Sequence, residues 1–108
     1  MPVYNKLVRD GIPDIIRRNG DSPVTHIATP LEYNQALHAK LQEEVHEFLK
    51  SGSAEELVDI LEVVYALAES QHVTVARLND LRWQKAEERG AFSERIILEE
   101  VIETSSGD

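Results

Sequence analysis

The amino-acid sequence predicts a mostly α-helical protein: an antiparallel helical bundle with a minor β ribbon, completed by oligomerisation. Three observations lead to this prediction. Capping and stop signals divide the chain into one short and three longer helical segments. The connections between the longer segments are short, which favours antiparallel neighbours. Residues 54–71 have an apolar side that spans over half the helix circumference, which is typical of a helix covered by neighbours on both sides.

The first helix and the ribbon are predicted from three short stretches. GIPDIIRRNG, residues 11–20, predicts a short helix, because Pro13 suits a first turn and Asn19-Gly20 supplies the left-handed residue that ends it. VTHIA, residues 24–28, and ERIILEEVIE, residues 94–103, are rich in β-branched side chains, so the two are predicted to pair as a small ribbon. A terminal helix is the alternative for the second run.

Capping signals mark the starts of the three longer helices. Thr29 and Glu32 have the spacing of a capping box, and Pro30 suits the first helical position, so a helix is predicted from there to about Lys50. Serine, threonine and glycine bound the other two in the same way. The second of the longer helices covers residues 54–71 and is capped by Ser53. The third runs from the cap Thr74 to about Arg89 and is closed by Gly90.

Length, charge and composition limit the possible functions. The chain of 108 residues and 12.2 kDa predicts a single domain over residues 1–103, with residues 104–108 as a disordered tail. Twenty acidic and eleven basic side chains give a formal charge of −9, so we expect no nucleic-acid partner and no membrane partner. Cysteine is absent, which excludes disulfides and thiolate zinc sites. With no apolar run of membrane-spanning or signal-peptide character, we expect a cytoplasmic protein.

Acidic side chains are concentrated on both sides of the Ser51-Gly52-Ser53 break. Glu44 lies at the border of the apolar stripe of its helix, with Glu47 beyond it. On the next helix Glu56 falls inside an apolar arc, and Asp59 lies at the edge of the same arc. A carboxylate that faces into such an arc must be paired, protonated or bound to a cation.

Two interpretations of these acids compete. Charged side chains on helices are usually solvated, and Ser53 with Glu56 also has capping-box spacing. Antiparallel helices joined by a tight turn, however, would bring the two acidic pairs together, and carboxylates about 4 Å apart repel by about 4 kcal/mol at an effective dielectric constant of about 20. A divalent cation would remove this penalty. Oxygen-only ligands predict a hard ion, Mg²⁺ or Mn²⁺.

The acidic pattern also resembles that of a known family. Glu43-Glu44-x-x-Glu47 is followed on the next helix by Glu56-x-x-Asp59. This E-E-x-x-E and E-x-x-D pattern resembles the MazG-like all-α nucleoside-triphosphate pyrophosphohydrolases. The flanks YNKLVRDGIPDII and KAEERGAFSERIIL look like the two ends of a small single-domain subgroup of house-cleaning enzymes, related to phosphoribosyl-ATP pyrophosphohydrolase. The resemblance covers nearly the whole chain.

The resemblance implies an activity and a set of site residues. Such enzymes hydrolyse a nucleoside triphosphate between the α- and β-phosphates with Mg²⁺, releasing monophosphate and pyrophosphate. The residues that this implies fall into three groups. They are the metal ligands Glu44, Glu47, Glu56 and Asp59; the catalytic residues Glu43 and Glu44, with Glu43 as a further ligand or water-orienting base; and the phosphate contacts Lys6, Arg9, Lys85 and Arg89. Gly11 stands where relatives often have Lys, and Ala91 replaces a Gly of the usual R-G-G-F pattern.

Association and function each leave alternatives open. A chain of this size buries a modest core, so we expect a homodimer or a dimer of dimers through the long helices. Hydrolysis of phosphoribosyl-ATP is one alternative activity. A helical regulatory or assembly module without catalysis is the other. No residue pattern identifies the base or sugar of a nucleotide substrate.

Overall fold

The structure is a computed structural model that describes residues 4–104. The chain divides into two units, Met1–Val75 and Ala76–Asp108. Within the described residues it forms four helices and no strand, so the predicted mostly helical class is confirmed. None of the helices in residues 4–104 is both long enough and apolar enough to cross a membrane. The tail predicted to be disordered lies, apart from Thr104, outside the described residues.

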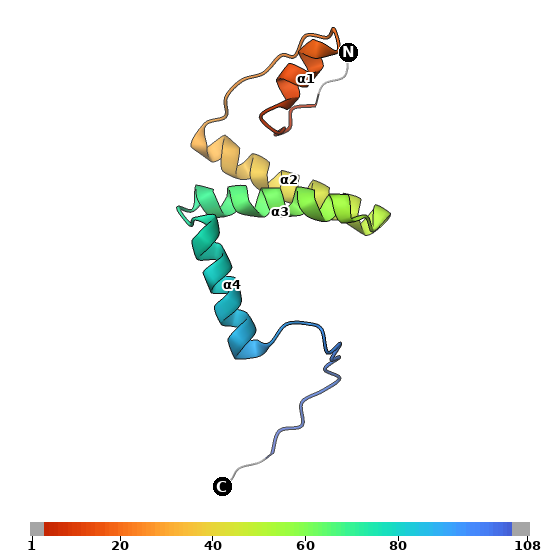
Figure 1. Cartoon of the computed structure of the whole chain (residues 1–108), viewed down its shortest axis with the longest axis vertical. Coiled ribbons are helices and arrows are strands. Elements are labelled where there is room, and N and C mark those ends of the chain that lie inside the picture. Colours follow the sequence, from red (N-terminus) through yellow and green to blue (C-terminus); the bar gives the residue numbers. More distant parts are fainter. Residues whose placement is uncertain (1–3, 105–108) are drawn as a thin grey trace. The chain divides into compact units, whose positions relative to one another are not determined.

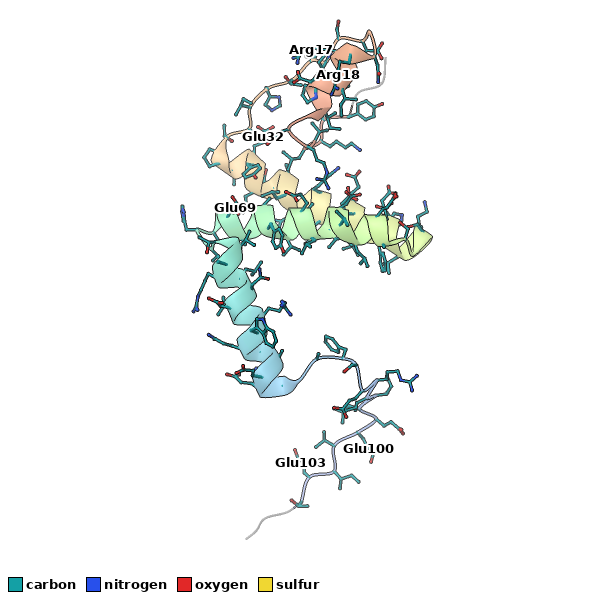
Figure 2. The ribbon with its side chains drawn as sticks, in the orientation of Figure 1. Arg17, Arg18, Glu32, Glu69, Glu100 and Glu103 are labelled. Carbon is teal, nitrogen blue, oxygen red and sulfur yellow. The ribbon has the colours of Figure 1, made fainter. Side chains whose placement is uncertain are left out.

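Helix α1, Ile12–Arg18, is the short helix predicted near the N-terminus (Figure 1). Proline stands in its first turn, and Gly20 follows it with a φ of 90°, a left-handed conformation that glycine adopts without steric cost. Arg17 and Arg18 lie in the last turn (Figure 2), where positive charge interacts favourably with the helix dipole. Arg17 Nη1 also donates a hydrogen bond of 2.8 Å to Asp14 Oδ1.

Helix α2, Pro30–Ser51, begins and ends as its capping signals predict. The Glu32 amide donates a hydrogen bond of 3.2 Å to Thr29 Oγ1, so Thr29 is the predicted N-cap. The Glu32 carboxylate lies 2.8 Å from His26 Nε2, and this hydrogen bond holds the pKa of Glu32 below its ordinary value. At the other end Gly52 has a φ of 65°, and its amide donates to the Phe48 carbonyl oxygen at 2.7 Å.

Helix α3, Ala54–Ser70, starts immediately after this turn, but the predicted side-chain cap at Ser53 is wrong. Ser53 occupies the N-cap position with extended backbone, yet its side chain makes no cap hydrogen bond. The Ser53 amide instead donates to Ser51 Oγ at 3.2 Å, and the Glu56 amide reaches the Ser53 carbonyl oxygen at 3.2 Å. The Ser51 hydroxyl and the Ser53 carbonyl oxygen thus accept the hydrogen bonds of this turn, in place of a side-chain cap.

Helices α2 and α3 pack side by side as an antiparallel hairpin (Figure 1). Leu37 of α2, at 1% exposure, and Val63 and Ala68 of α3 are the buried apolar side chains of the described residues. All three belong to these two helices. The hairpin therefore carries the core of the first unit and sets the positions of the acidic residues on both helices.

Helix α4, Val75–Arg89, begins directly after Thr74, and Gly90 follows its last residue with a φ of 82°. Both bounds agree with the sequence prediction. After a short turn the chain runs on without regular structure through Glu100 and Glu103 (Figure 2).

The predicted β ribbon is not seen. Residues 24–28 and 96–103 are neither strand nor helix, and they belong to different units. Their large apolar side chains are exposed, from 99% at Val24 to 72% at Val101. A strand needs a partner for its backbone hydrogen bonds, and neither segment has one among the described residues. The ribbon stays a prediction.

The difference between the two caps gives a matched pair of substitutions. Thr29→Ala removes a side-chain cap bond and should lower the free energy of unfolding by about 1 kcal/mol. Ser53→Ala removes a side chain that makes no such bond, so its effect should stay within about 0.5 kcal/mol. Urea denaturation of both variants measures the difference. Equal losses would contradict the assignment of the caps.

Candidate metal centre

Three carboxylates meet across the α2–α3 hairpin. Glu44 of α2 and Glu56 and Asp59 of α3 each offer one oxygen, and these three oxygens lie within 4.8 Å of one another. Glu44 is buried, at 8% exposure, whereas Glu56 and Asp59 are half-buried. We call these three residues the acidic cluster. It is the one group of this kind among the described residues.

The sequence brings the cluster together through the turn at Gly52. Glu56 and Asp59 are three residues apart, so they share one face of α3. Glu44 and Asp59 are at similar sequence distances from Gly52, on opposite sides of it, so an antiparallel hairpin places them level with each other. The tight turn therefore determines which acids face each other.

The pKa of Glu56 shows the effect of this crowding. Loss of solvent around the carboxylate raises the pKa above its ordinary value of 4.5, and the negative charges of Glu47, Asp59 and Glu44 raise it further. The free protein therefore holds Glu56 in its charged form at a cost in free energy. A cation placed among these carboxylates would remove that cost.

Three basic side chains already offset part of the negative charge. Lys40 Nζ lies 3.4 Å from Glu44 Oε1 and 3.6 Å from Glu43 Oε2. Lys6 Nζ donates a hydrogen bond of 3.0 Å to Glu43 Oε1, and Arg9 Nη2 donates one of 2.7 Å to Asp59 Oδ1. The acids of the hairpin thus contact cations from two parts of the chain.

Glu43 lies outside the acidic cluster and has two lysines as partners. The hydrogen bond from Lys6 lowers the pKa of Glu43, to which Lys40 adds, and Glu43 in turn raises the pKa of Lys6. Both groups are therefore charged near neutral pH. Glu43 is a carboxylate beside the cluster and not a member of it.

Lys40 is a site residue that the sequence reasoning missed. Its side chain is only 18% exposed, and it contacts two of the predicted site residues. The signal was present in the sequence, because Lys40 precedes Glu43 by three residues and Glu44 by four, the spacings at which helical side chains meet.

The other predicted site residues lie outside the cluster. Glu47 is exposed, but its charge acts on Glu56. Lys85 and Arg89 are on α4, in the second unit, where they are four residues apart on one face. Lys6 and Arg9 precede α1 and contact acids, not solvent alone.

The residues of the acidic cluster fit a hard divalent cation. Mg²⁺ binds oxygen ligands at about 2.0–2.1 Å in an octahedron, in which opposite oxygens are about 4.2 Å apart. Neighbouring oxygens of such an octahedron are about 2.9 Å apart. The three carboxylate oxygens, which lie within 4.8 Å of one another, would therefore have to move closer together around an ion. Mg²⁺ commonly keeps water and binds through few carboxylates, which leaves positions for substrate oxygens.

Part of the chain is similar to a known protein. Over 42 residues the chain is 52% identical to an uncharacterized protein of Mycolicibacterium smegmatis (strain ATCC 700084 / mc(2)155). The match covers 39% of this chain and 43% of that protein, so the chain spans less than half the length of the curated relative it matches. No family model matches the chain, and no solved structure matches it significantly.

Glu56→Gln tests the acidic cluster through its pKa. An acid whose folded-state pKa is raised costs stability as the pH rises from its unfolded pKa of 4.5 through the folded value. The metal-free variant should therefore equal or exceed the wild type in melting temperature at pH 7, with the difference vanishing below pH 4.5. Its Mg²⁺ affinity should fall by about tenfold or more.

Glu55→Gln is the control for this substitution. Glu55 is an exposed acid of the same first turn of α3, so it has the same relation to the helix dipole, but it lies outside the cluster. Its metal affinity should match the wild type. A Glu56→Gln variant that binds Mg²⁺ as tightly as the Glu55→Gln variant would refute the ligand assignment.

Proposed function

We propose that the protein is a Mg²⁺-dependent nucleoside-triphosphate pyrophosphohydrolase of the MazG-like type, acting in the cytoplasm on non-canonical nucleotides. The observation that carries the proposal is the convergence of Glu44, Glu56 and Asp59 across an antiparallel hairpin. Residues of the motif that resembles this family lie on two adjacent helices with oxygens within 4.8 Å. Carboxylates at such separations repel one another, and a bound cation would offset this repulsion.

The reaction adds one water across the α–β phosphoanhydride bond and gives a monophosphate and pyrophosphate. Mg²⁺ or Mn²⁺, when bound, would neutralise charge on the phosphate oxygens and activate the attacking water. Glu44, Glu56 and Asp59 would hold the ion, and Glu47 would join them by a change of rotamer. The family resemblance proposes Glu43, which lies next to Glu44 in sequence, as a further ligand or as the residue that orients the attacking water.

Fixed positive charge is needed for the triphosphate, because the protein is acidic overall. Lys6 and Arg9 are placed near the acidic cluster by their contacts with Glu43 and Asp59, so they can reach phosphates held at the metal. Lys85 and Arg89 are proposed as further phosphate contacts from their shared face on α4 and from the family resemblance. Each of these four side chains would stabilise charge that the metal does not neutralise.

The proposed architecture is completed by a second copy, as a homodimer or a dimer of dimers. Leu57, Val58 and Leu61 of α3 are 49%, 61% and 47% exposed, so the hairpin leaves much of the apolar side of α3 uncovered. Val45 and Leu49 of α2 are exposed as well. Burial of such side chains is worth about 1.5–3 kcal/mol each. The predicted ribbon would find its pairing in the same assembly.

Product analysis tests the activity. With Mg²⁺ or Mn²⁺ the protein should release pyrophosphate and monophosphate from a nucleoside triphosphate, and chelation of the metal should abolish turnover. A panel of ordinary and damaged triphosphates together with phosphoribosyl-ATP identifies the substrate, and a preference for the last would favour that alternative. Orthophosphate as the sole initial product would sink the proposal, since it indicates cleavage of the γ-phosphate. Failure of all substrates with bound Mg²⁺ would favour a non-catalytic module.

Sedimentation at micromolar concentration tests the assembly. The species observed should be at least a dimer of the 12.2 kDa chain, because the apolar side of α3 is too wide for one helix to cover. Val58→Asp should shift the equilibrium toward monomer, whereas Glu55→Gln, at an exposed polar position of the same helix, should not. A folded wild-type monomer at this concentration would count against the proposed architecture.

A further inference from the structure

Two ion pairs join the segment before α1 to the hairpin. Lys6 Nζ lies 3.0 Å from Glu43 Oε1 on α2, and Arg9 Nη2 lies 2.7 Å from Asp59 Oδ1 on α3. Residues 4–10 therefore reach both helices of the hairpin, one cation on each. We call residues 4–10 the N-terminal strap.

Apolar side chains of the strap are only partly covered, and Val8 is 37% exposed. Of the described residues of the strap only Leu7 is half-buried, and the others are exposed. A cavity of about 70 Å³ remains between the strap and α2, lined by Asn5 and Leu7 on one side and by Ala36 and Ala39 on the other. The Lys6 ammonium also lies 5.7 Å from the centre of the Tyr4 ring, within the strap itself. The polar contacts between strap and hairpin are thus two partly exposed ion pairs, which are weak.

Arg9 and a divalent cation compete for the same acid. Asp59 is a member of the acidic cluster and also the partner of Arg9. A guanidinium stays protonated at all relevant pH values, so Arg9 cannot relieve the repulsion by losing its charge. An ion held by Asp59 would repel Arg9 and also take the carboxylate charge that keeps Arg9 in place. Lys40 is different, because it is anchored on the same helix as Glu44 and remains beside it.

We infer that the N-terminal strap is an exchangeable counter-charge: Arg9 neutralises Asp59 in the metal-free protein, and a bound divalent cation displaces it toward the phosphates of the substrate. This inference rests on the proposed function, because it assumes that the acidic cluster binds the ion. It adds an order of events. The ion binds first, and the released Arg9 then completes the site for an anionic ligand.

Calorimetric titration with Mg²⁺, without nucleotide, tests the competition. Arg9→Gln removes the competitor, so the full-length variant should bind Mg²⁺ about two- to fivefold more tightly than the wild type, the range expected for a partly exposed ion pair. Arg17→Gln is the matched control. Arg17 also makes a hydrogen-bonded ion pair, with Asp14 at 2.8 Å, and its removal changes the net charge equally, but its acid lies outside the cluster. Its affinity should equal that of the wild type.

Tryptic cleavage after Lys6 and Arg9 gives a second readout, independent of affinity. Mg²⁺ should speed cleavage of the wild type at these positions relative to a chelator, because the strap leaves the hairpin. Asp59→Asn removes the partner of Arg9, so the same fast cleavage should occur without Mg²⁺. Protection that Mg²⁺ increases would overturn the inference.

The outcomes separate the strap from the proposed function. If the wild type binds Mg²⁺ and Arg9→Gln binds it no more tightly than Arg17→Gln does, the strap inference is wrong and the metal site stands. If the wild type binds no Mg²⁺, the metal site fails and the inference fails with it. Tighter binding by Arg9→Gln alone, together with faster cleavage in Mg²⁺, supports both.

Discussion

Repulsion among the carboxylates of the α2–α3 hairpin is the main constraint on the arrangement of charged residues in the first unit. The antiparallel packing of α2 against α3 brings one carboxylate oxygen of Glu44 within 4.8 Å of one oxygen each of Glu56 and Asp59. Lys6, Arg9 and Lys40 offset part of this negative charge. Loss of solvent and the neighbouring carboxylates still raise the pKa of Glu56.

The basic residues that offset this negative charge differ in how they are held beside the acids. Lys40 is one turn from Glu44 on the same helix, so its contact follows from the helix itself and persists whatever else binds. Arg9 reaches Asp59 from a separate segment through a partly exposed ion pair, which is weak. In the proposed site Lys40 would stay in place and Arg9 would be replaceable. This division would suit a centre that accepts a divalent ion and an anion in turn.

Local signals and distant contacts explain what the sequence could and could not predict. Gly20, Gly52 and Gly90 have positive φ at the ends of helices where the sequence placed stops, because left-handed residues are a local requirement. The opposition of the acidic residues followed from the tight turn. The pairs Lys6–Glu43 and Arg9–Asp59 did not, since 37 and 50 residues separate the partners and no periodicity links them. The ribbon failed to appear for a related reason: β propensity indicates what a segment can do with a partner, not that it has one.

The same helix carries the acids and the uncovered apolar side chains, which couples assembly to the site. On α3, Leu57 and Val58 stand between Glu56 and Asp59 in sequence and are largely exposed. A second copy that covers them in the proposed dimer would lower the local dielectric constant around the two acids and strengthen their repulsion. It would also hold α3 more rigidly. Both effects increase the free energy gained when a cation binds, so association should favour the metal-bound form, and by linkage the metal should favour association.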